Sequence, residues 1–420
     1  MTPDTAAAPV VPPAPPARPA RGRALEVHRS LPRYLATRTA TRLGGALLGG
    51  SGALAVAPLR LVDARTPQPP RPDWVRVGVH LSGICGSDLA TVTGQSSLYF
   101  SPLVSMPFVP GHEVVGELLD ATDTLPAGTR VVLDPVLGCA ARGESPCPAC
   151  RAGQGNRCER VATGHLAPGL QTGYCRDTGG GWGSVLVAHP SQLHPVPDAL
   201  PDEIAVLVEP LACAVHTARR AQVGEDDHVL VLGAGAVGLF TTLALRRLAP
   251  AARLSVVAKH PRQKALATLF GADDVWEPGA ATALARRATG AVRLSPERGP
   301  DFLLGGVSVA IEATGSPDGL ATALRVTRAG GRVVLSGLPT GGVDLTPAWF
   351  RELDVVGTYA TGGDDFAVAL ELATDAAAEG LLDGAVGGVY PLARYADAID
   401  HARNAGRLGT LKVAFDPRSP

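Results

Sequence analysis

The chain has 420 residues, of which 45% are hydrophobic and 18% charged, and its formal net charge is −1. This length exceeds one ordinary hydrophobic core, so two domains are the simplest expectation. The 38 basic and 39 acidic residues form no long single-sign block. That distribution argues against a nucleic-acid or membrane-surface partner and favours a small, weakly charged ligand.

The N-terminal part of the chain predicts an extension. Residues 1–23 carry seven prolines among alanines and arginines, a composition typical of disorder. We therefore expect residues 1–50 to be disordered or poorly defined. The basic stretch HRSLPRYLATRTATRLGGALLGG resembles a targeting sequence but begins too deep for a secretory signal, so a cytoplasmic location is expected.

Two kinds of sequence pattern follow the N-terminal extension. Short β-rich runs such as LRLVDA and WVRVGVHL, broken by Pro and Gly, predict an irregular β-rich domain over residues 51–212. Strand-like and helix-like segments then alternate, from HVLVLG to GRVVLSGLP, and predict a doubly wound parallel α/β sheet over residues 213–358. Residues 359–420 end in LKVAFDP, a strand that we expect to rejoin the first domain.

A glycine-rich turn lies between the first predicted strand of the α/β domain and its helix. The turn reads GAGAVG, and its context favours dinucleotide binding over an ordinary glycine-rich turn, because glycines let a pyrophosphate approach a helix N-terminus. The run from Val229 to Leu245 that contains it approaches membrane-spanning length, but its glycines argue against a span. The predicted cofactor-binding residues are Gly233, Gly235, Ala236, Val237 and Gly238, with Thr314 and Gly337 at the ends of later strands.

The end of the second α/β strand concerns the choice of cofactor. A fold that prefers NAD usually places an acid there, whereas this chain has Ala258, followed by Lys259, His260 and Arg262. Without an acid to repel a 2′-phosphate, and with positive charge on the adjoining turn, the sequence predicts NADP over NAD. The alternative is a solvated basic turn that contacts nothing.

Two further motifs supply metal ligands beside glycine turns. GICGSD contains Cys85, and PGHEVVG contains His112 and Glu113, while Glu209 stands in VEPLACAVH just before the α/β domain. Thiolate, imidazole and carboxylate together suit an open catalytic zinc site. Taken singly, Cys85 is also explained as a small core residue, His112 as a satisfied polar group and Glu209 as a helix-start carboxylate.

Four of the seven cysteines fall in the stretch CAARGESPCPACRAGQGNRC, at Cys139, Cys147, Cys150 and Cys158. Disulfides, a Cys-x-x-Cys redox couple and a structural zinc site are the alternatives. An odd number of cysteines without a signal peptide indicates a reducing compartment, which disfavours disulfides. The Pro- and Gly-rich surroundings do not suggest the thioredoxin-like helix of a redox couple.

Five motifs occur along the chain in this order: CGSD, GHEVVG, the cysteine cluster, VEPLACAVH and GAGAVG. Through them the chain resembles the zinc-dependent medium-chain alcohol dehydrogenase family over about residues 55–415. The resemblance implies a GroES-like catalytic domain split around a Rossmann domain, with zinc and nicotinamide meeting in the cleft between them. Carboxylate at Glu209 resembles the polyol, sugar and threonine dehydrogenase branch.

The resemblance also assigns roles to single residues. It implies that the four cysteines bind a structural zinc, although seven residues separate Cys139 from Cys147 where many relatives have two. It makes Ser87 the hydroxyl that takes the alcohol proton, and Asp88 an orienting group for the zinc-binding loop; as alternatives, each caps a turn or helix. We count Ser87 and Glu113 as catalytic. Ala90 occupies the place of a relay histidine.

The expected activity is hydride transfer between a secondary alcohol, polyol or sugar-like substrate and a nicotinamide cofactor, with one catalytic and one structural zinc. The partners are then a small alcohol or carbonyl compound and further copies of the chain, in a dimer or tetramer, without nucleic acid or membrane. The alternatives are a non-catalytic nucleotide-binding member of the fold and a zinc-free enone or quinone reductase. Metal content separates both from the main prediction.

Overall fold

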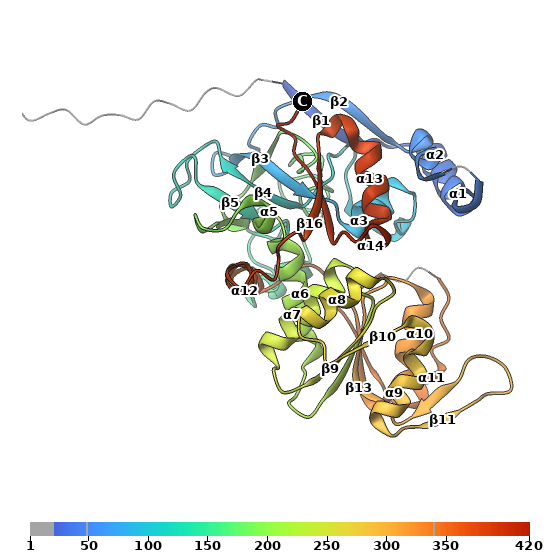
Figure 1. The fold of residues 1–420 in the computed structure, drawn as a ribbon. Helices are drawn as coiled ribbons and strands as arrows, with labels where there is room; N and C mark the ends of the chain where they lie inside the picture. Colours follow the sequence, from blue (N-terminus) through green and yellow to red (C-terminus); the bar gives the residue numbers. More distant parts are fainter. Residues whose placement is uncertain (1–20, 48, 339–340) are drawn as a thin grey trace, which may run out of the picture.

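A computed structural model describes residues 21–47, 49–338 and 341–420, and two bodies stand out within them, each built on its own sheet (Figure 1). The lower body is a parallel α/β sheet flanked by helices, and the upper body is β-rich. The fold class predicted from the sequence, a β-rich domain joined to a doubly wound parallel sheet, is confirmed.

The α/β body has six strands in the order β10-β9-β8-β13-β14-β15, and every pairing is parallel. This is the order of a Rossmann sheet. The strands are β8 (His228–Leu232), β9 (Arg253–Val257), β10 (Asp274–Trp276), β13 (Val307–Glu312), β14 (Thr327–Leu335) and β15 (Asp354–Gly357). The helices are α7 (Ala236–Leu248), α8 (Pro261–Leu269), α9 (Ala281–Thr289), α10 (Pro317–Val326) and α11 (Thr346–Phe350); β11 (Val292–Leu294) and β12 (Phe302–Leu304) form a separate hairpin.

The β-rich body contains the order β16-β17-β3-β4-β5-β7, with β6 also paired to β3. Its strands are β3 (Val75–Gly83), β4 (Glu113–Leu118), β5 (Arg130–Leu133), β6 (Val185–Ala188), β7 (Leu193–Pro195), β16 (Val386–Tyr390) and β17 (Lys412–Phe415). Its helices are α3 (Gly86–Val92), α4 (Pro148–Arg151), α5 (Asp202–Ala205), α13 (Tyr395–Arg403) and α14 (Ala405–Leu408). β17 pairs antiparallel with β3, so the end of the chain lies in the sheet that the first domain begins.

The segment before residue 59 differs from the disorder that its composition predicts. β1 (Arg21–Val27) pairs antiparallel with β2 (Leu59–Arg65), and α1 (Leu31–Leu47) and α2 (Gly49–Val56) lie between them. Leu25 and Val27 are buried in a core that includes Phe108 and Trp182, which supplies the hydrophobic burial that composition alone did not reveal. The expectation for residues 1–20 lies outside the described residues.

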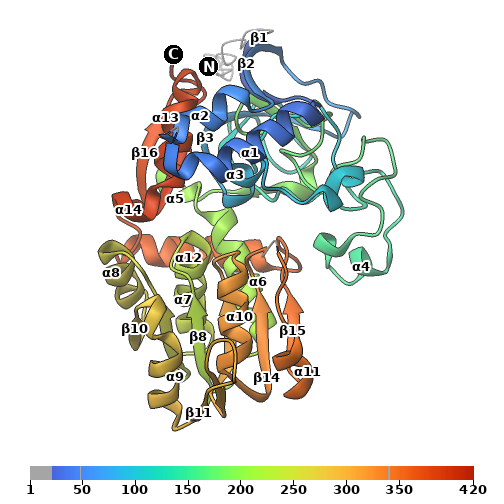
Figure 2. The same ribbon diagram turned by 90° about the vertical axis from the view of Figure 1, so that its right-hand side faces the viewer.

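Two helices occupy the junction of the bodies, α6 (Val208–Ala221) and α12 (Asp365–Ala378) (Figure 2). α6 leads into β8, and the chain returns from β15 through residues 358–364 into α12. Nearly all of α6 is buried, so the helix joins the two cores. None of the described helices is long and apolar enough to cross a membrane.

Candidate functional site

The first group of predicted metal ligands is assembled at the start of two elements. Cys85 is the residue before α3, and His112 and Glu113 lie where β4 begins, directly after Gly111 with its φ of +92°. One ligand atom from each of the three residues lies within 4.8 Å of the other two. The structure therefore brings a thiol, an imidazole and a carboxylate to one point, hereafter the catalytic trio.

Asp88 orients this trio from the first turn of α3. One carboxylate oxygen accepts a hydrogen bond from the backbone N–H of Cys85 at 3.0 Å, and the other lies 3.5 Å from His112 Nδ1. A carboxylate behind a metal-binding histidine fixes the ring and its tautomer. Asp88 thus caps α3, and its second oxygen faces His112 without a hydrogen bond.

Glu113 has one paired and one unpaired oxygen. Lys412 on β17 donates from Nζ to Glu113 Oε1 at 2.6 Å, and both side chains are buried. Glu113 Oε2 is buried without a hydrogen-bond partner. A Cβ on Gly83 would come within 1.9 Å of Oε2, so a larger residue there would displace this oxygen. A buried, unpaired carboxylate oxygen beside a thiol and an imidazole fits a divalent cation such as zinc.

Glu209 lies on the first turn of α6, beside the trio but outside the group of atoms within 4.8 Å. Burial raises the pKa of Glu209 to about 7, while His112 and Lys412 act in the opposite direction. Its Oε1 accepts a hydrogen bond from the thiol of Cys213, one turn further along α6, at 3.4 Å. Glu113 rather than Glu209 is therefore the carboxylate closest to the other two predicted ligands.

The second group of predicted ligands is complete. The sulfur atoms of Cys139, Cys147, Cys150 and Cys158 all lie within 4.8 Å of one another, in what we call the four-cysteine lobe. All seven cysteines of the chain are free. Cys139 Sγ lies 3.6 Å from Cys158 Sγ, too far for a disulfide. Tetrahedral zinc with Zn–S bonds of about 2.3 Å would separate its sulfurs by about 3.8 Å, so the lobe fits zinc.

A buried arginine, Arg142, holds the long loop between Cys139 and Cys147, so that both cysteines still reach the lobe. The guanidinium of Arg142 donates to the carbonyl oxygens of Leu137 at 3.1 Å, Thr163 at 2.9 Å and Gly169 at 2.6 Å. These bonds fold the loop after Cys139 back on itself. In the lobe, backbone N–H groups of Glu159 and Cys150 lower the pKa of Cys147 to about 6, which favours thiolate.

The glycine turn of the α/β body has the form that a pyrophosphate requires. Gly233 has a φ of +111°, and a Cβ there would lie 2.8 Å from Thr314 Cγ2. A Cβ on Gly238 would lie 2.0 Å from the oxygen of Gly233, so these two glycines permit close packing. Nothing lies within 4 Å of a Cβ on Gly235, the residue that caps α7. The open side of the turn faces the helix N-terminus, where anions bind.

The remaining predicted cofactor residues surround this turn. Ala236 and Val237 open α7, and Gly337 packs on Gly315, where a Cβ would lie 2.3 Å from its nitrogen. The buried carboxylate of Glu312, which sequence reasoning missed, accepts hydrogen bonds from Thr314 N at 2.8 Å and Gly315 N at 3.1 Å. That carboxylate fixes the loop at the end of β13.

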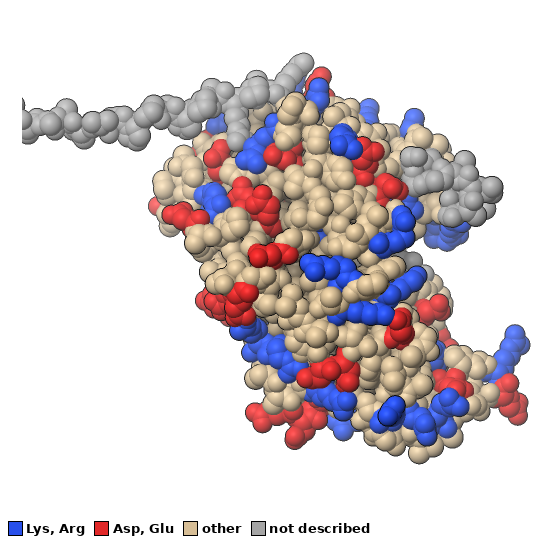
Figure 3. Space-filling model, in the orientation of Figure 1, with Lys and Arg blue, Asp and Glu red and all other residues tan. Residues whose placement is uncertain are grey.

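The basic turn lies on the surface after β9. Ala258 is buried, Lys259 and Arg262 are exposed, and His260 is half-buried as the residue before α8. Basic side chains gather around α8, near the junction of the two bodies (Figure 3). Arg262 lines a small cavity together with Ala234 and Gly235, and residues 405–406 and 409–411 close its other side.

A group of hydroxyls lies beside the trio. Ser87 is exposed on α3, and its carbonyl oxygen accepts a hydrogen bond from Thr91 Oγ1 at 3.0 Å. The hydroxyl of Tyr174 lies 3.3 Å from Thr91 Oγ1, which in turn lies 3.1 Å from Ser96 Oγ. The ring centroids of Tyr174 and His112 are 6.0 Å apart, and burial raises the pKa of Tyr174. Sequence reasoning missed Tyr174, because no motif marks it.

Comparison with known proteins gives the class of this arrangement. The family described as alcohol dehydrogenase GroES-like domain matches residues 71–198, and the family described as zinc-binding dehydrogenase matches residues 236–375. The chain is 34% identical to L-idonate 5-dehydrogenase of Vitis vinifera over 68% of this chain and 73% of that protein. It is 33% identical to sorbitol dehydrogenase of Arabidopsis thaliana over 69% and 74%.

A solved structure described as a putative zinc-binding dehydrogenase from Sinorhizobium meliloti 1021 bound to NADP is 26% identical, with a TM-score of 0.66, and the match covers 86% of this chain and 96% of that one. The chain belongs to the zinc-dependent medium-chain alcohol dehydrogenase family. The predicted family, fold class and NAD(P)-dependent oxidoreductase activity are confirmed.

Proposed function

We propose that this protein transfers hydride between a secondary alcohol of the polyol or sugar type and NADP, using one catalytic and one structural zinc. The observation that carries the proposal is the catalytic trio with its buried, unpaired Glu113 oxygen. The four-cysteine lobe supports a second, structural zinc. Relatives described as L-idonate and sorbitol dehydrogenases support the substrate class.

Cys85, His112 and Glu113 would hold the catalytic zinc, with Glu209 beside them. When bound there, zinc supplies a Lewis acid that lowers the pKa of an alcohol oxygen. The hydroxyl of Ser87 would receive the proton of the alcohol, and the linked hydroxyls of Tyr174, Thr91 and Ser96 would supply an onward partner where the sequence has Ala90 instead of a histidine. The glycine turn would hold the pyrophosphate, and Lys259, His260 and Arg262 the 2′-phosphate.

Metal analysis combined with a substrate screen tests the proposal. The purified protein should contain two zinc ions per chain, and Cys85→Ser and Cys150→Ser should each lose about one. Alcohols, polyols and amino alcohols are then offered with NADP and with NAD, and reduced cofactor is followed by absorbance. Turnover of a polyol that disappears in Cys85→Ser supports the proposal.

Two results would contradict this assignment. Turnover of an enone by zinc-free protein would indicate the reductase alternative. Tight NADPH binding without turnover of any alcohol or carbonyl compound would indicate the non-catalytic alternative.

A further inference from the structure

The return crossover between the two bodies is held by the four-cysteine lobe. Residues 358–364 lead from β15 to α12, and the N–H of Gly363 donates to the carbonyl oxygen of Gly153, in the lobe, at 2.6 Å. Ala360 has a φ of +48°, a conformation that a non-glycine residue adopts at some energetic cost. The crossover therefore has a specific path that its neighbours must fix.

Asn156 makes the second contact of the lobe with the crossover, and it lies between the ligand cysteines Cys150 and Cys158. Its Nδ2 donates to the carbonyl oxygen of Tyr359 at 2.8 Å and lies 3.3 Å from His216 Nε2. The opposite amide orientation would set Oδ1 against the Tyr359 carbonyl, so the donor assignment follows from the partners.

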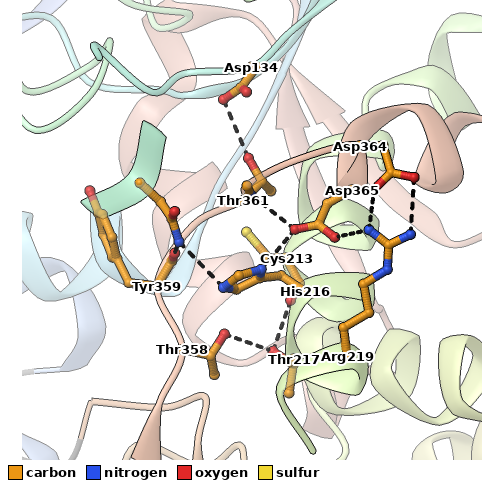
Figure 4. Close-up of polar contacts among 12 residues, drawn as sticks. Asp134, Cys213, His216, Thr217, Arg219, Thr358, Tyr359, Thr361, Asp364 and Asp365 are labelled. Atoms are coloured by element: carbon orange, nitrogen blue, oxygen red, sulfur yellow. Dashed lines mark hydrogen bonds and ion pairs between the residues drawn. The ribbon is translucent and has the colours of Figure 1, made fainter. Parts of the chain in front are cut away.

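The tautomer of His216 follows from that assignment. Because Asn156 donates to Nε2, the ring carries its proton on Nδ1, which lies 2.7 Å from Asp365 Oδ2. The same Asp365 oxygen accepts from the N–H of Gly362 at 2.9 Å, and Arg219 donates to the other oxygen at 2.7 Å (Figure 4). One chain of hydrogen bonds therefore runs from the lobe through α6 to the first residue of α12.

This chain also determines where Tyr359 lies. The Tyr359 hydroxyl donates to Gln171 Oε1 at 3.2 Å, while Asn156 holds its carbonyl. Tyr359 is 41% exposed, so these two hydrogen bonds, rather than burial, fix its position. A residue of the crossover is thus anchored to the lobe. His216 and Asp365 are buried, so losing one partner would leave a buried polar group unsatisfied.

We propose that Asn156 and His216 are positioning residues that latch the four-cysteine lobe to the interdomain crossover, so that the lobe sets the path of residues 358–364 and the position of Tyr359. The role of the lobe then extends beyond local stability. The inference does not require the proposed alcohol substrate, because it concerns contacts within the chain alone.

Hydrogen–deuterium exchange on the protein as purified tests the latch without turnover. Asn156→Asp keeps the size of the side chain but cannot donate to the Tyr359 carbonyl, so amides in 358–364 should exchange about tenfold faster, as expected for the loss of one hydrogen bond. His216→Phe, which changes no lobe residue, should accelerate the same amides. Arg157→Ala, an exposed neighbour in the same turn, is the matched control and should leave them unchanged.

Two outcomes would overturn the latch. In the first, neither Asn156→Asp nor His216→Phe accelerates exchange of 358–364 beyond the Arg157→Ala control. In the second, His216→Phe accelerates these amides but Asn156→Asp does not, so that His216 acts on the crossover without the lobe. Because no substrate is added, failure of the proposed activity would affect neither measurement.

Discussion

At the level of single residues, the two oxygens of the buried Glu113 carboxylate have different surroundings, because Lys412 contacts only one of them. Lys412 occupies one oxygen of Glu113 and leaves the other directed to the trio. Without the lysine, Glu113 would be a buried carboxylate that has lost its ion-pair partner, an arrangement that is costly. The pair therefore keeps one carboxylate oxygen of Glu113 beside a thiol and an imidazole.

His112→Ala tests the trio directly. Loss of a ligand imidazole should weaken metal binding and lower kcat/KM by more than about 100-fold. The dissociation constant for NADPH, measured by calorimetry, should change by less than about threefold, because the glycine turn lies on the other body. His189→Ala, a half-buried histidine that follows β6 in the β-rich body and lies outside the trio, serves as the control and should keep its activity.

Sequence reasoning found the trio because each ligand stands beside a glycine turn within a short motif. It missed Lys412 and Tyr174 because both residues contact the trio from segments that are far away in the sequence. Lys412 meets Glu113 across 299 residues, a contact made only when β17 joins the sheet of β3 and β4. Such pairs are properties of tertiary structure, and local patterns do not contain them.

At the scale of elements, the segment from β1 to β2 shows that composition alone can wrongly predict disorder. Proline and alanine content predicts disorder up to residue 50, yet β1 and α1 begin within that range. Helix α1 also contacts the loop after α3, because Thr41 Oγ1 on α1 donates to the carbonyl oxygen of Thr93 at 3.1 Å. Gly94 must be glycine there, since a Cβ would lie 2.9 Å from Arg38 N. Burial against another element outweighs weak local propensity.

The prediction that the protein prefers NADP over NAD rests on the turn between β9 and α8. Arg262→Ala should weaken NADP about tenfold, because a charged hydrogen bond contributes about 1.5 to 3 kcal/mol when well formed and less at an exposed rim. Adding Ala258→Asp should reverse the preference, since the carboxylate repels a 2′-phosphate and accepts ribose hydroxyls. Steady-state kcat/KM with both cofactors measures the change.

Lys264→Ala provides the control for that prediction. It removes a positive charge from the same helix, where Lys264 pairs with Glu277, and should leave the preference unchanged. A higher kcat/KM with NAD than with NADP in the unaltered enzyme would show that the basic turn is merely a solvated surface. The zinc assignment would be unaffected by that result.

For the whole molecule, the alternation of strands and helices predicted the parallel sheet, and its strand order follows the Rossmann pattern. The junction of the two bodies was not predictable in the same way. It depends on Asp134 after β5, His216 on α6 and Asp365 on α12, which come from three distant segments. Each is an ordinary polar residue in the sequence and gains its role only when the bodies meet.

Asp134 makes stability depend on pH at this junction. Burial raises the pKa of Asp134 to about 7, above the ordinary 3.8, and Asp365 contributes in the same direction. The folded state therefore holds a proton that the unfolded chain releases, so the free energy of unfolding falls as pH rises from about 4 to 7. Asp134→Asn should remove this loss and raise Tm at pH 8 by about 2 °C or more, with a smaller gain at pH 5.

Thermal unfolding of Asp134→Asn and of the control Asp123→Asn, at pH 5 and pH 8, measures the effect. Asp123 is exposed in the loop before β5, and its replacement should leave both Tm values unchanged. Equal Tm gains at the two pH values would mean that the Asp134 carboxyl does not hold a proton in the folded protein.

The free edge of the α/β sheet leads to the last prediction, a homodimer. β15 ends the sheet, and within the described strands it pairs with β14 alone. Val355 on β15 is 41% exposed, and Trp349 and Phe350 on the preceding α11 are 81% and 62% exposed. An open strand edge with large exposed apolar side chains is typical of an interface, and antiparallel pairing of two β15 strands about a two-fold axis would cover both.

Light scattering should therefore give twice the chain mass of 43.0 kDa. Trp349→Glu combined with Val355→Lys should yield monomers, because each change places a charge in the proposed contact. Leu98→Glu alters an exposed apolar residue of the β-rich body and should leave the dimer intact. A dimer that survives the double change would place the interface elsewhere, and a monomeric unaltered protein would rule out dimerisation through β15.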